Sequence, residues 1–316
     1  MDEATPSSSP PEGTQRVTIA IILNGISFKK KFFYSKILPP LQKAFEVRVF
    51  ETRSKTEAIF LASDAVEKKF HVILAAGGDG TVNQVLNGML QGREEKSDLP
   101  ILGVIPLGTG NDFARALKLT TDVQQLINRL TRMTPNTLDV GKIEYQQDGK
   151  SSLSYFINVA DAGMGPEVVS RLMESSRPFG SAVAYYAAII STFFSYKPMR
   201  VKIKTETWTW ENQLRTVAIG NGNFYGHGLC IAPDATPDDG VFSTFVCGDV
   251  SVLEFIRYSG TLKASKKIVH PKISYSSAMQ LELTAAEPCR IEADGELLGF
   301  LPATISILPS RIRLLC

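Results

Sequence analysis

Cysteine and histidine are scarce in this sequence, and its charges nearly cancel. The 316 residues include four cysteines and three histidines, and no two cysteines form a Cys-x-x-Cys pair. A disulfide framework or a zinc site would need denser spacing, so we expect reduced thiols in a reducing cytoplasm. The 34 basic and 32 acidic residues leave a net charge of +2. That charge is too small to indicate a nucleic-acid-binding surface.

Long apolar runs are also missing. No stretch reaches the ~18 residues of a membrane-spanning helix. Residues 1–15 are acidic, rich in proline and serine, and contain no apolar segment of the kind found in secretory signals. We therefore predict a disordered tail on a cytoplasmic protein. The G-x-x-x-x-G-K-[ST] and G-x-G-x-x-G fingerprints are absent as well, which argues against the P-loop and Rossmann classes.

The first half of the chain alternates strand-length apolar runs with helical patterns. Strands are expected over Val17–Leu23, Val47–Phe50, Val72–Ala76 and Ile101–Ile105. Helices are expected over Lys29–Phe45, Thr56–Lys69, Val82–Leu90, Asn111–Leu117 and Val123–Arg132. This order predicts a parallel sheet covered by helices, in which ligands bind at the carboxyl ends of the strands.

The second half has a different sequence pattern. Short segments in which apolar and polar residues alternate are rich in β-branched and aromatic residues. These segments are Leu153–Val159, Arg200–Trp210, Leu214–Ile219, Val241–Val246, Met279–Leu283, Cys289–Glu292 and Thr304–Leu308. Helices are expected over Glu167–Glu174, Ser181–Ser195 and Val252–Leu262. We therefore predict an α/β domain over residues 16–137 and a β-rich, mostly antiparallel domain over residues 138–308.

Two glycine-rich turns follow predicted strands. The first is Gly77-Gly-Asp-Gly-Thr81, and the second is Pro106-Leu-Gly-Thr-Gly-Asn-Asp-Phe-Ala-Arg115. Glycines let the backbone approach a phosphate, and the N–H groups at a helix start favour an anion. Asp79 has the oxygen chemistry that Mg²⁺ prefers. Either turn could be a plain connection, but two turns on adjacent strand ends favour a shared phosphate site.

The paired turns resemble the diacylglycerol kinase catalytic domain and, more narrowly, bacterial lipid kinases related to diacylglycerol and sphingosine kinases. Later landmarks occur in the same order: Leu138-Asp-Val-Gly141, Ile219-Gly-Asn-Gly222, the loop Ala232–Gly240, and Asp294-Gly-Glu296. The resemblance covers residues 16–316. It implies an α/β nucleotide domain similar to NAD kinases and phosphofructokinases, a β-sandwich-like second domain, and an active site in the cleft between them. It also implies that residues 309–316 return to the first domain.

The resemblance assigns an ATP site to both turns and to the ends of the first two strands. The implied nucleotide-binding residues are Asn24, Thr52, Ala76, Gly77, Gly78, Asp79, Gly80, Thr81, Val82 and Thr109. Many members carry N-P-x-[SA]-G after the first strand, whereas this chain has Asn24-Gly-Ile-Ser27 and lacks both the proline and the closing glycine. For Thr52 a local turn hydrogen bond is the alternative role.

The resemblance also assigns a metal site and a catalytic base. A structural Mg²⁺ would take the Asp239 carboxylate and the main-chain carbonyls of Thr236 and Val241, a donor set that suits a hard cation. The base would come from Asp294-Gly-Glu296, with Glu296 favoured and Asp294 second. The two side chains could share a direction or diverge, and Asp-Gly is also a common hairpin dipeptide. Asp139 is expected to support a water and metal network that includes Asp79.

The sequence thus predicts a peripheral cytoplasmic lipid kinase that uses ATP and Mg²⁺. Its acceptor would be a hydroxyl of a glycerolipid, such as diacylglycerol or phosphatidylglycerol. Transient docking on a membrane surface could use Ser181–Lys197, although core packing is the commoner fate of such a helix. A homodimer is left open. The alternatives are an NAD kinase-like enzyme and a catalytically weak nucleotide- or lipid-sensing protein.

Overall fold

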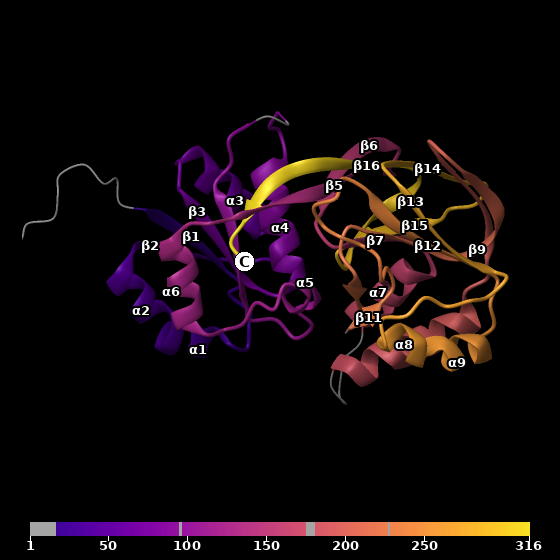
Figure 1. Cartoon of the computed structure of the whole chain (residues 1–316), viewed down its shortest axis with the longest axis horizontal. Helices are drawn as coiled ribbons and strands as arrows, with labels where there is room; N and C mark the ends of the chain where they lie inside the picture. The colour runs from indigo at the N-terminus through magenta and orange to yellow at the C-terminus, as the bar shows by residue number, and fades with distance from the viewer. Residues whose placement is uncertain (1–16, 95–96, 175–180, 227) are drawn as a thin grey trace, which may run out of the picture.

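A computed structural model describes residues 17–94, 97–174, 181–226 and 228–316. The predicted tail over residues 1–15 lies outside the described residues. The described chain forms two lobes, an α/β lobe at the left of Figure 1 and a β-rich lobe at the right.

The first lobe contains a parallel sheet in the order β2 (Glu46–Glu51), β1 (Thr18–Leu23), β3 (Val72–Gly77) and β4 (Ile101–Pro106). Every residue of β3 and β4 is buried. This burial explains why these strands read as continuous apolar runs, since helices cover both faces of such a sheet. The helices are α1 (Lys30–Phe32), the π-helical η1 (Phe33–Ile37), α2 (Leu38–Ala44), α3 (Glu57–Glu67), α4 (Asp79–Leu90), α5 (Asp112–Ala116) and α6 (Val123–Arg132).

The predicted strands and helices of this lobe are confirmed, with one informative difference. Helix α4 begins at Asp79, three residues before the predicted start at Val82. Gly78 adopts an extended conformation as the N-cap, so Asp79, Gly80 and Thr81 form the first turn of the helix. The apolar periodicity could not reveal this turn because it contains no apolar side chain. Its main-chain N–H groups therefore belong to a helix N-terminus.

The second lobe is built mainly from antiparallel strands. They are β5 (Asn136–Gln147), β6 (Lys150–Phe156), β7 (Val159–Gly163), β8 (Met199–Thr205), β9 (Thr209–Gly220), β10 (Phe224–Tyr225), β11 (Leu229–Cys230), β12 (Phe242–Gly248), β13 (Ile273–Ala278), β14 (Gln280–Ala285), β15 (Arg290–Ala293) and β16 (Glu296–Leu314). Pairing runs β9-β7-β15-β16-β14-β8 and returns to β9, which encloses an apolar cluster. Helices α7 (Met164–Glu174), α8 (Ser181–Ser195) and α9 (Val252–Lys263) lie below the sheet in Figure 1.

Several strand predictions in this lobe were wrong in their limits. The segment Leu153–Val159 spans two strands, β6 and β7, and Arg200–Trp210 contains the end of β8, a turn and the start of β9. Strands β5 and β13 were not predicted. Thr304–Leu308 is only the middle of the 19-residue strand β16. Strand β5 has consecutive buried residues in place of an alternating pattern, and β13 is mostly polar and has a single buried residue.

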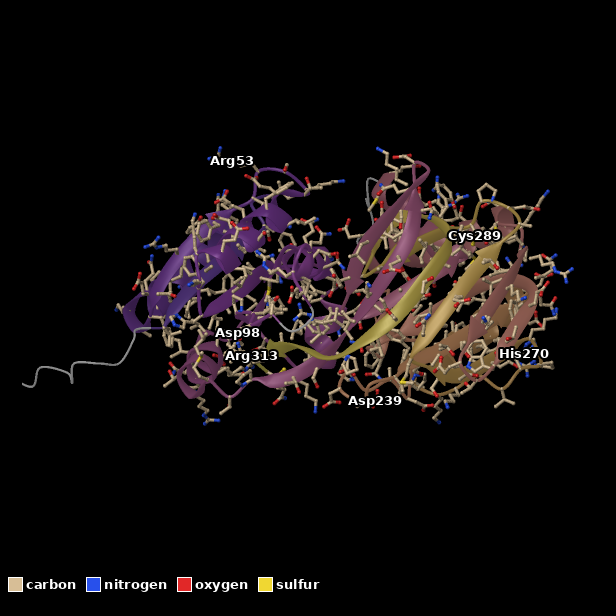
Figure 2. The ribbon with its side chains drawn as sticks, turned by 90° about the horizontal axis from the view of Figure 1, so that it is seen from above. Arg53, Asp98, Asp239, His270, Cys289 and Arg313 are labelled. Carbon is tan, nitrogen blue, oxygen red and sulfur yellow. The ribbon has the colours of Figure 1, made fainter. Side chains whose placement is uncertain are left out.

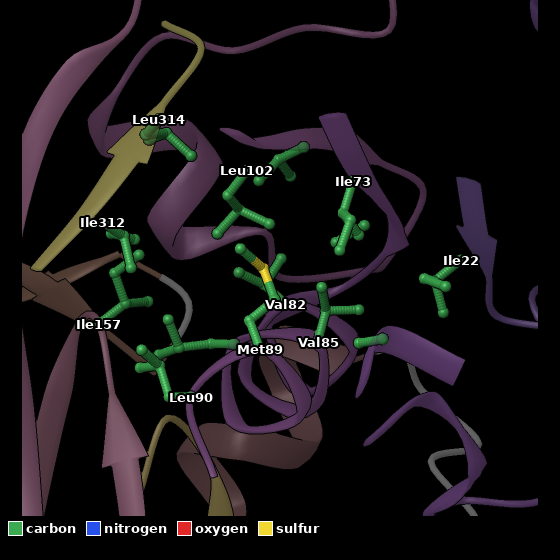
Figure 3. Packing of buried hydrophobic residues seen from close by; sticks show 14 of the residues in the cluster. Ile22, Ile73, Val82, Val85, Met89, Leu90, Leu102, Ile157, Ile312 and Leu314 are labelled. Atoms are coloured by element: carbon green, nitrogen blue, oxygen red, sulfur yellow. The ribbon is translucent and has the colours of Figure 1, made fainter. Parts of the chain in front are cut away.

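Strand β16 joins the two lobes. It pairs with β5 along much of its length, and at its end Leu314 pairs in parallel with Leu102 of β4. Ile157 and Ile312 pack with Val82 and Leu102 in the core of the first lobe (Figure 3). At the surface, Arg313 forms an ion pair with Asp98 at 2.9 Å, where Figure 2 labels both residues. The sheet is therefore continuous from one lobe to the other.

Candidate active site

A polar pocket of about 520 Å³ lies at the carboxyl ends of the parallel strands. It is lined by Asn24, Ile26, Thr52, Arg53, Ser54, Lys55, Ala58, Gly78, Gly80, Thr81, Gln84, Gly108 and Glu296. The fold thus collects five of the predicted nucleotide-binding residues at one strand edge: Asn24, Thr52, Gly78, Gly80 and Thr81. The two basic side chains in this pocket, Arg53 and Lys55, follow strand β2.

The two glycine-rich turns touch each other through their backbones. A Cβ atom on Gly108 would lie 2.3 Å from the Cα of Gly78, and one on Gly77 would lie 2.2 Å from the Thr81 Oγ1. A side chain on Gly108 would therefore push the turns apart, and one on Gly77 would clash with Thr81 within the first turn. Gly108 N–H also donates to the Gly77 carbonyl. The glycines are explained by this close approach, since neither residue has a positive φ.

Asp79 links the first turn to the helix that follows the second. Its Oδ2 accepts from the Asp112 N–H and its Oδ1 from the Phe113 N–H, both at 3.1 Å. Burial and then the neighbouring Asp112 raise the pKa of Asp79, while the N–H donors act in the opposite sense. The carboxylate therefore fixes the start of α5 against the start of α4.

Asn24 ties the end of β1 to the start of α4, and Thr52 ties the end of β2 to the loop after β1. The Asn24 side-chain amide donates to the Thr81 Oγ1 at 3.4 Å, and the Thr52 Oγ1 accepts from the Gly25 N–H at 3.2 Å. This bond joins residues that are 27 positions apart in the sequence, so it differs from the local turn bond considered as the alternative role. Thr52 also lines the pocket. These bonds shape the loop after β1, although it lacks the proline and closing glycine of the common pattern.

The other five residues of the predicted nucleotide-binding set do not line the polar pocket. Ala76 and Val82 are buried in the core and line neither of the two pockets described here, as Figure 3 shows for Val82. Gly77 is also buried, whereas Asp79 and Thr109 line the neighbouring pocket. We therefore remove Ala76 and Val82 from the residues expected to contact the nucleotide. Their side chains pack in the core and hold the glycine-rich turn in position.

The neighbouring pocket, about 320 Å³ in volume, lies between the lobes. The first lobe contributes residues of both glycine-rich turns, among them Asp79 and Thr109. The second lobe contributes an apolar wall from α7 and acidic residues from the β15–β16 hairpin: Val168, Val169, Leu172, Met173, Glu292, Asp294 and Glu296. Gly78, Gly80 and Glu296 line both pockets, so the pockets meet at these residues.

Asp294 and Gly295 form the two-residue turn of the β15–β16 hairpin, with φ values of 51° and 83°. The turn makes the two acidic side chains diverge. The Asp294 carboxylate accepts from the N–H groups of Ile157, Asn158 and Val159 and from the Asn83 amide, at 3.0–3.1 Å. Burial raises the pKa of Asp294 to about 6, and these donors act in the opposite sense. Four donors make Asp294 an anchor for the hairpin.

Glu296 points toward the start of α4. A Cβ atom on Gly80 would lie only 2.6 Å from the Glu296 Oε1, so glycine is needed for this approach. Burial raises the pKa of Glu296, the Lys55 ammonium lowers it, and Asp294 raises it again. The arrangement brings a carboxylate of the second lobe onto the glycine-rich turn of the first.

Sequence reasoning missed the polar residues of α4 that connect the lobes. The Asn83 amide donates to Asp294 and to the Tyr155 carbonyl, and the Asn87 Oδ1 accepts from the Tyr155 N–H at 2.9 Å. Both asparagines are almost fully buried. Their spacing of four residues on one helix face was the available signal. Lys55 was missed too, and its signal was a basic residue just after the carboxyl end of a strand.

The predicted metal loop lies elsewhere. Asp239 is exposed and lines neither pocket, and Figure 2 places it well away from Arg53 of the polar pocket. Its Oδ1 accepts from the Val241 N–H at 3.1 Å. In the described part of the chain, no group of three or more His, Cys, Asp or Glu side chains could hold a metal ion.

The expected role of Asp139 is corrected. Its carboxylate accepts from the Gly240 N–H and the Ser310 N–H, both at 2.7 Å, and its own N–H donates to the Pro237 carbonyl. These bonds tie the Asp239 loop to β16 and engage both carboxylate oxygens of Asp139. Asp139 therefore stabilises the junction between the lobes.

Comparison with known proteins gives two matching family models. The diacylglycerol kinase catalytic domain matches residues 18–143, and the YegS C-terminal NAD kinase beta sandwich-like domain matches residues 158–316. A diacylglycerol kinase of Staphylococcus epidermidis is 30% identical over 303 residues, covering 93% of this chain and 90% of the relative. A diacylglycerol kinase of Bacillus subtilis is 28% identical over 277 residues, covering 87% of each chain.

Solved structures agree on the fold. A structure described as a diacylglycerol kinase from Bacillus anthracis aligns with a TM-score of 0.69 at 21% identity, covering 96% of this chain and 98% of that one. A second structure from the same organism reaches a TM-score of 0.75 at 24% identity with the same coverage. The chain therefore belongs to the family of bacterial lipid kinases that carry the diacylglycerol kinase catalytic domain.

Proposed function

We propose that this lipid kinase transfers the γ-phosphoryl group of ATP to a hydroxyl of a glycerolipid, with diacylglycerol as the first candidate acceptor. One observation carries the proposal. The polar pocket and the pocket with the apolar wall meet at Gly78, Gly80 and Glu296. A nucleotide in the first pocket and a lipid alcohol in the second would bring their reacting groups together at a carboxylate.

The charges of the polar pocket suit a nucleoside triphosphate. Arg53 and Lys55 supply positive charge on one side, and the N-terminus of α4 supplies main-chain N–H groups on the other. Phosphoryl transfer depends mainly on positioning and on neutralising phosphate charge. The pocket therefore fits the triphosphate better than it fits an apolar ligand.

Glu296 is our candidate for the general base. Its raised pKa brings a carboxyl group closer to neutral pH, where a base removes a proton from an alcohol more effectively. Asp294 would act as a positioning residue, because its two oxygens already accept four hydrogen bonds. The Asn83–Asp294 bond would keep Glu296 over Gly80.

Mg²⁺ is expected at two places. In the reaction it would neutralise triphosphate oxygens, next to the acidic wall that includes Asp79 and Asp112. In the loop before β12, the Asp239 carboxylate and the carbonyls of Thr236 and Val241 would supply the hard oxygen donors that Mg²⁺ prefers. Asp139 holds this loop against β16, so a cation there would stabilise the junction between the lobes.

Lipid access would come from the water side through helix α8. Within the described residues, no helix is long and apolar enough to cross a membrane. One face of α8 packs into the core through Tyr185, Ile189 and Phe193. The other face exposes Val183, Ile190 and Phe194, and Phe194 is 77% exposed. We propose that this exposed face of α8 makes a transient contact with the membrane.

The direct test is transfer of label from γ-labelled ATP with Mg²⁺ to lipids in mixed micelles. The panel contains diacylglycerol, phosphatidylglycerol, a monoacylglycerol, a sphingoid base and NAD. We expect label on diacylglycerol. Label on NAD alone would overturn the lipid assignment and favour an NAD kinase-like enzyme. Binding of ATP without label on any acceptor would favour a sensing role.

Replacing Lys55 with methionine is expected to weaken ATP use. A charge-assisted hydrogen bond contributes about 1.5–3 kcal/mol, so the kcat/KM for ATP should fall about 10- to 100-fold, mainly through a higher KM. Steady-state kinetics at varied ATP and saturating lipid measures this effect. Lys36→Met, on the exposed face of η1, is the matched control. An unchanged KM for ATP in Lys55→Met would place the triphosphate elsewhere.

A further inference from the structure

The pocket between the lobes is lined by acidic side chains and, among the described residues, by no basic one. The acidic side chains are Asp79, Asp112, Glu292, Asp294 and Glu296. Main-chain N–H groups hold Asp79 and Asp294 in place. Asp112 forms an ion pair with Arg115 at 2.7 Å. Since Glu296 is the candidate base, Glu292 is the acid whose presence in the pocket the reaction does not yet explain.

Glu292 lies on β15, just before the hairpin turn, and is only 2% exposed. Its register partner on β7, Asp161, is fully buried. The Gly295 N–H donates to the Glu292 Oε2 at 2.8 Å. The described residues donate no hydrogen bond to the second oxygen, Oε1. One carboxyl oxygen is therefore engaged in the hairpin, and the other is available to a molecule in the pocket.

The neighbours of Glu292 favour its neutral form. Burial is the main cause that raises its pKa, and the carboxyl groups of Asp161, Asp294 and Glu296 raise it further. The Gly295 N–H acts in the opposite sense. Because Oε2 already accepts from this N–H, the proton of the neutral carboxyl group belongs on Oε1. That oxygen then carries a hydrogen-bond donor.

No cation from the described elements around Glu292 reverses this preference. Tyr185 of α8 and Tyr225 of β10 line the same pocket, and burial raises the pKa of both hydroxyls well above their usual range. The residues that α7 contributes to the pocket carry no charge. Arg290, two residues earlier on β15, lies 3.6 Å from Glu167 of α7 and does not line the pocket.

An ester carbonyl is the acceptor that best fits such a donor. A buried donor without an acceptor is costly, so the pocket favours a ligand that supplies one. A carbonyl oxygen is neutral and is not repelled by the surrounding acids, in contrast to a carboxylate or a phosphate. The ammonium of a sphingoid base would need the ionised form of Glu292. Among the candidate acceptors, the acylglycerols carry ester carbonyls.

We propose that Glu292 is a specificity-determining residue whose Oε1–H donates a hydrogen bond to an ester carbonyl of the lipid acceptor. The inference rests on the proposed function, because it names a contact of the same lipid in the same pocket. In a diacylglycerol, one ester is attached to the carbon next to the one that bears the reacting hydroxyl. One molecule could therefore place its hydroxyl at Glu296 and its carbonyl at Glu292, which lie on the two strands of one hairpin.

A comparison of ester- and ether-linked acceptors tests the proposal. The probes are dioleoylglycerol and its ether analogue dioleylglycerol, in which CH₂ groups replace the two carbonyls. In mixed micelles we expect the wild type to use the ester with a kcat/KM about 3- to 10-fold higher, because the ether lacks a neutral hydrogen bond. Glu292→Met removes the donor and nearly keeps the size of the side chain, so this ratio should fall to about one. Glu287→Met, on an exposed residue before β15, is the matched control and should keep the wild-type ratio.

Glu292→Gln keeps the proposal testable if Glu292→Met does not fold. The amide N–H can donate in place of Oε1–H, so this variant should still prefer the ester. In the wild type, a rise in pH that ionises Glu292 should bring the ratio toward one, and Glu292→Gln should lack this change. The ratio is insensitive to the titration of Glu296, because both acceptors need the same base.

The outcomes separate this inference from the proposed function. A wild type that phosphorylates the ester and the ether equally well would overturn the inference and leave the lipid kinase standing. The same holds for an ester preference that survives in Glu292→Met. A sphingoid base preferred by the wild type and lost in Glu292→Gln would overturn it too and indicate an ionised Glu292. If the wild type labelled no lipid at all, the proposed function would fail and the inference with it.

Discussion

Replacing Glu296 with glutamine is expected to lower kcat by about 10²–10⁴-fold, the usual contribution of a general base. The amide keeps the shape of the side chain near Gly80 but cannot accept the proton of the lipid hydroxyl. ATP affinity should change little, because the polar pocket keeps Lys55, Arg53 and the N-terminus of α4. Turnover of diacylglycerol in mixed micelles and equilibrium binding of ATP measure the two quantities separately.

The pH dependence of kcat/KM, measured for the wild type and for Glu296→Gln, gives a sharper test of the general base. A base works when deprotonated, so the kcat/KM of the wild type should fall as the pH drops through the pKa of Glu296. Burial raises that pKa, so the loss should begin at a higher pH than for an ordinary glutamate. The residual activity of Glu296→Gln should lack this acid limb. Glu282→Gln, on the exposed side of β14, is the control.

Asp294→Asn separates the roles of the two acids. The amide cannot accept all four hydrogen bonds that Asp294 now receives, so this variant should lose both thermal stability and activity. Glu296→Gln should lose activity and keep the melting temperature of the wild type. If Asp294→Asn were as stable as the wild type and inactive, while Glu296→Gln stayed active, the assignment of the base would be reversed.

The second large expected effect is a pH dependence of the free energy of unfolding, caused by a pair of buried acids. Asp161 of β7 and Glu292 of β15 are register partners on adjacent strands and are 0% and 2% exposed. Burial raises the pKa of Asp161 to about 8, with its hydrogen bonds to Thr216 and Gly165 acting in the opposite sense. Burial, with a further contribution from Asp161, raises the pKa of Glu292 well above its usual range. The folded protein therefore favours the protonated form of both groups.

The sign of the pH dependence follows from these shifts. The ordinary pKa of Asp161 is 3.8 and its folded pKa is about 8. Between these values the folded chain binds more protons than the unfolded chain, so the free energy of unfolding falls as the pH rises. We expect the protein to be more stable at pH 6 than at pH 8.5. This contribution is fully present below the unfolded pKa and is lost as the pH rises through the folded pKa.

Replacing Asp161 with asparagine should remove part of this loss. At about 1.4 kcal/mol per pKa unit, the drop in unfolding free energy between pH 6 and pH 8.5 should shrink by about 2–3 kcal/mol. Urea unfolding at the two pH values measures the change. Asp64→Asn, on the surface of α3, is the control and should leave the drop unchanged. A wild type equally stable at both pH values would show that the pair is ionised in the folded state.

Much of this molecule can be predicted from local sequence. The parallel strands of the first lobe read as apolar runs because they are buried on both faces, and the glycine-rich turns after β3 and β4 identified the strand edge that collects Asn24, Thr52 and Gly78. The four cysteines are free, as expected from their spacing. Helices α8 and α9 were predicted within one residue of their observed limits. Helix α8 is apolar on both faces, and α9 begins at a capping box formed by Ser251 and Glu254.

The limits of sequence reasoning show in residues whose role depends on a distant partner. Asn83 and Asp294 are 211 positions apart, and no local sequence pattern predicts the hydrogen bond between them. The same holds for Asp139, which turned out to hold Gly240 and Ser310 and makes no bond to Asp79.

By itself, the sequence determined the two-part organisation and the glycine-rich turns, and it limited the candidate base to two acids, Asp294 and Glu296. These features depend on residues close together in the chain, whose conformational preferences and burial pattern are local. Only the tertiary structure decided that Asp294 turns inward while Glu296 faces Gly80, and that Glu292 lines the pocket between the lobes. Those outcomes depend on which strands pair and in what register, and that is set by the packing of the whole chain.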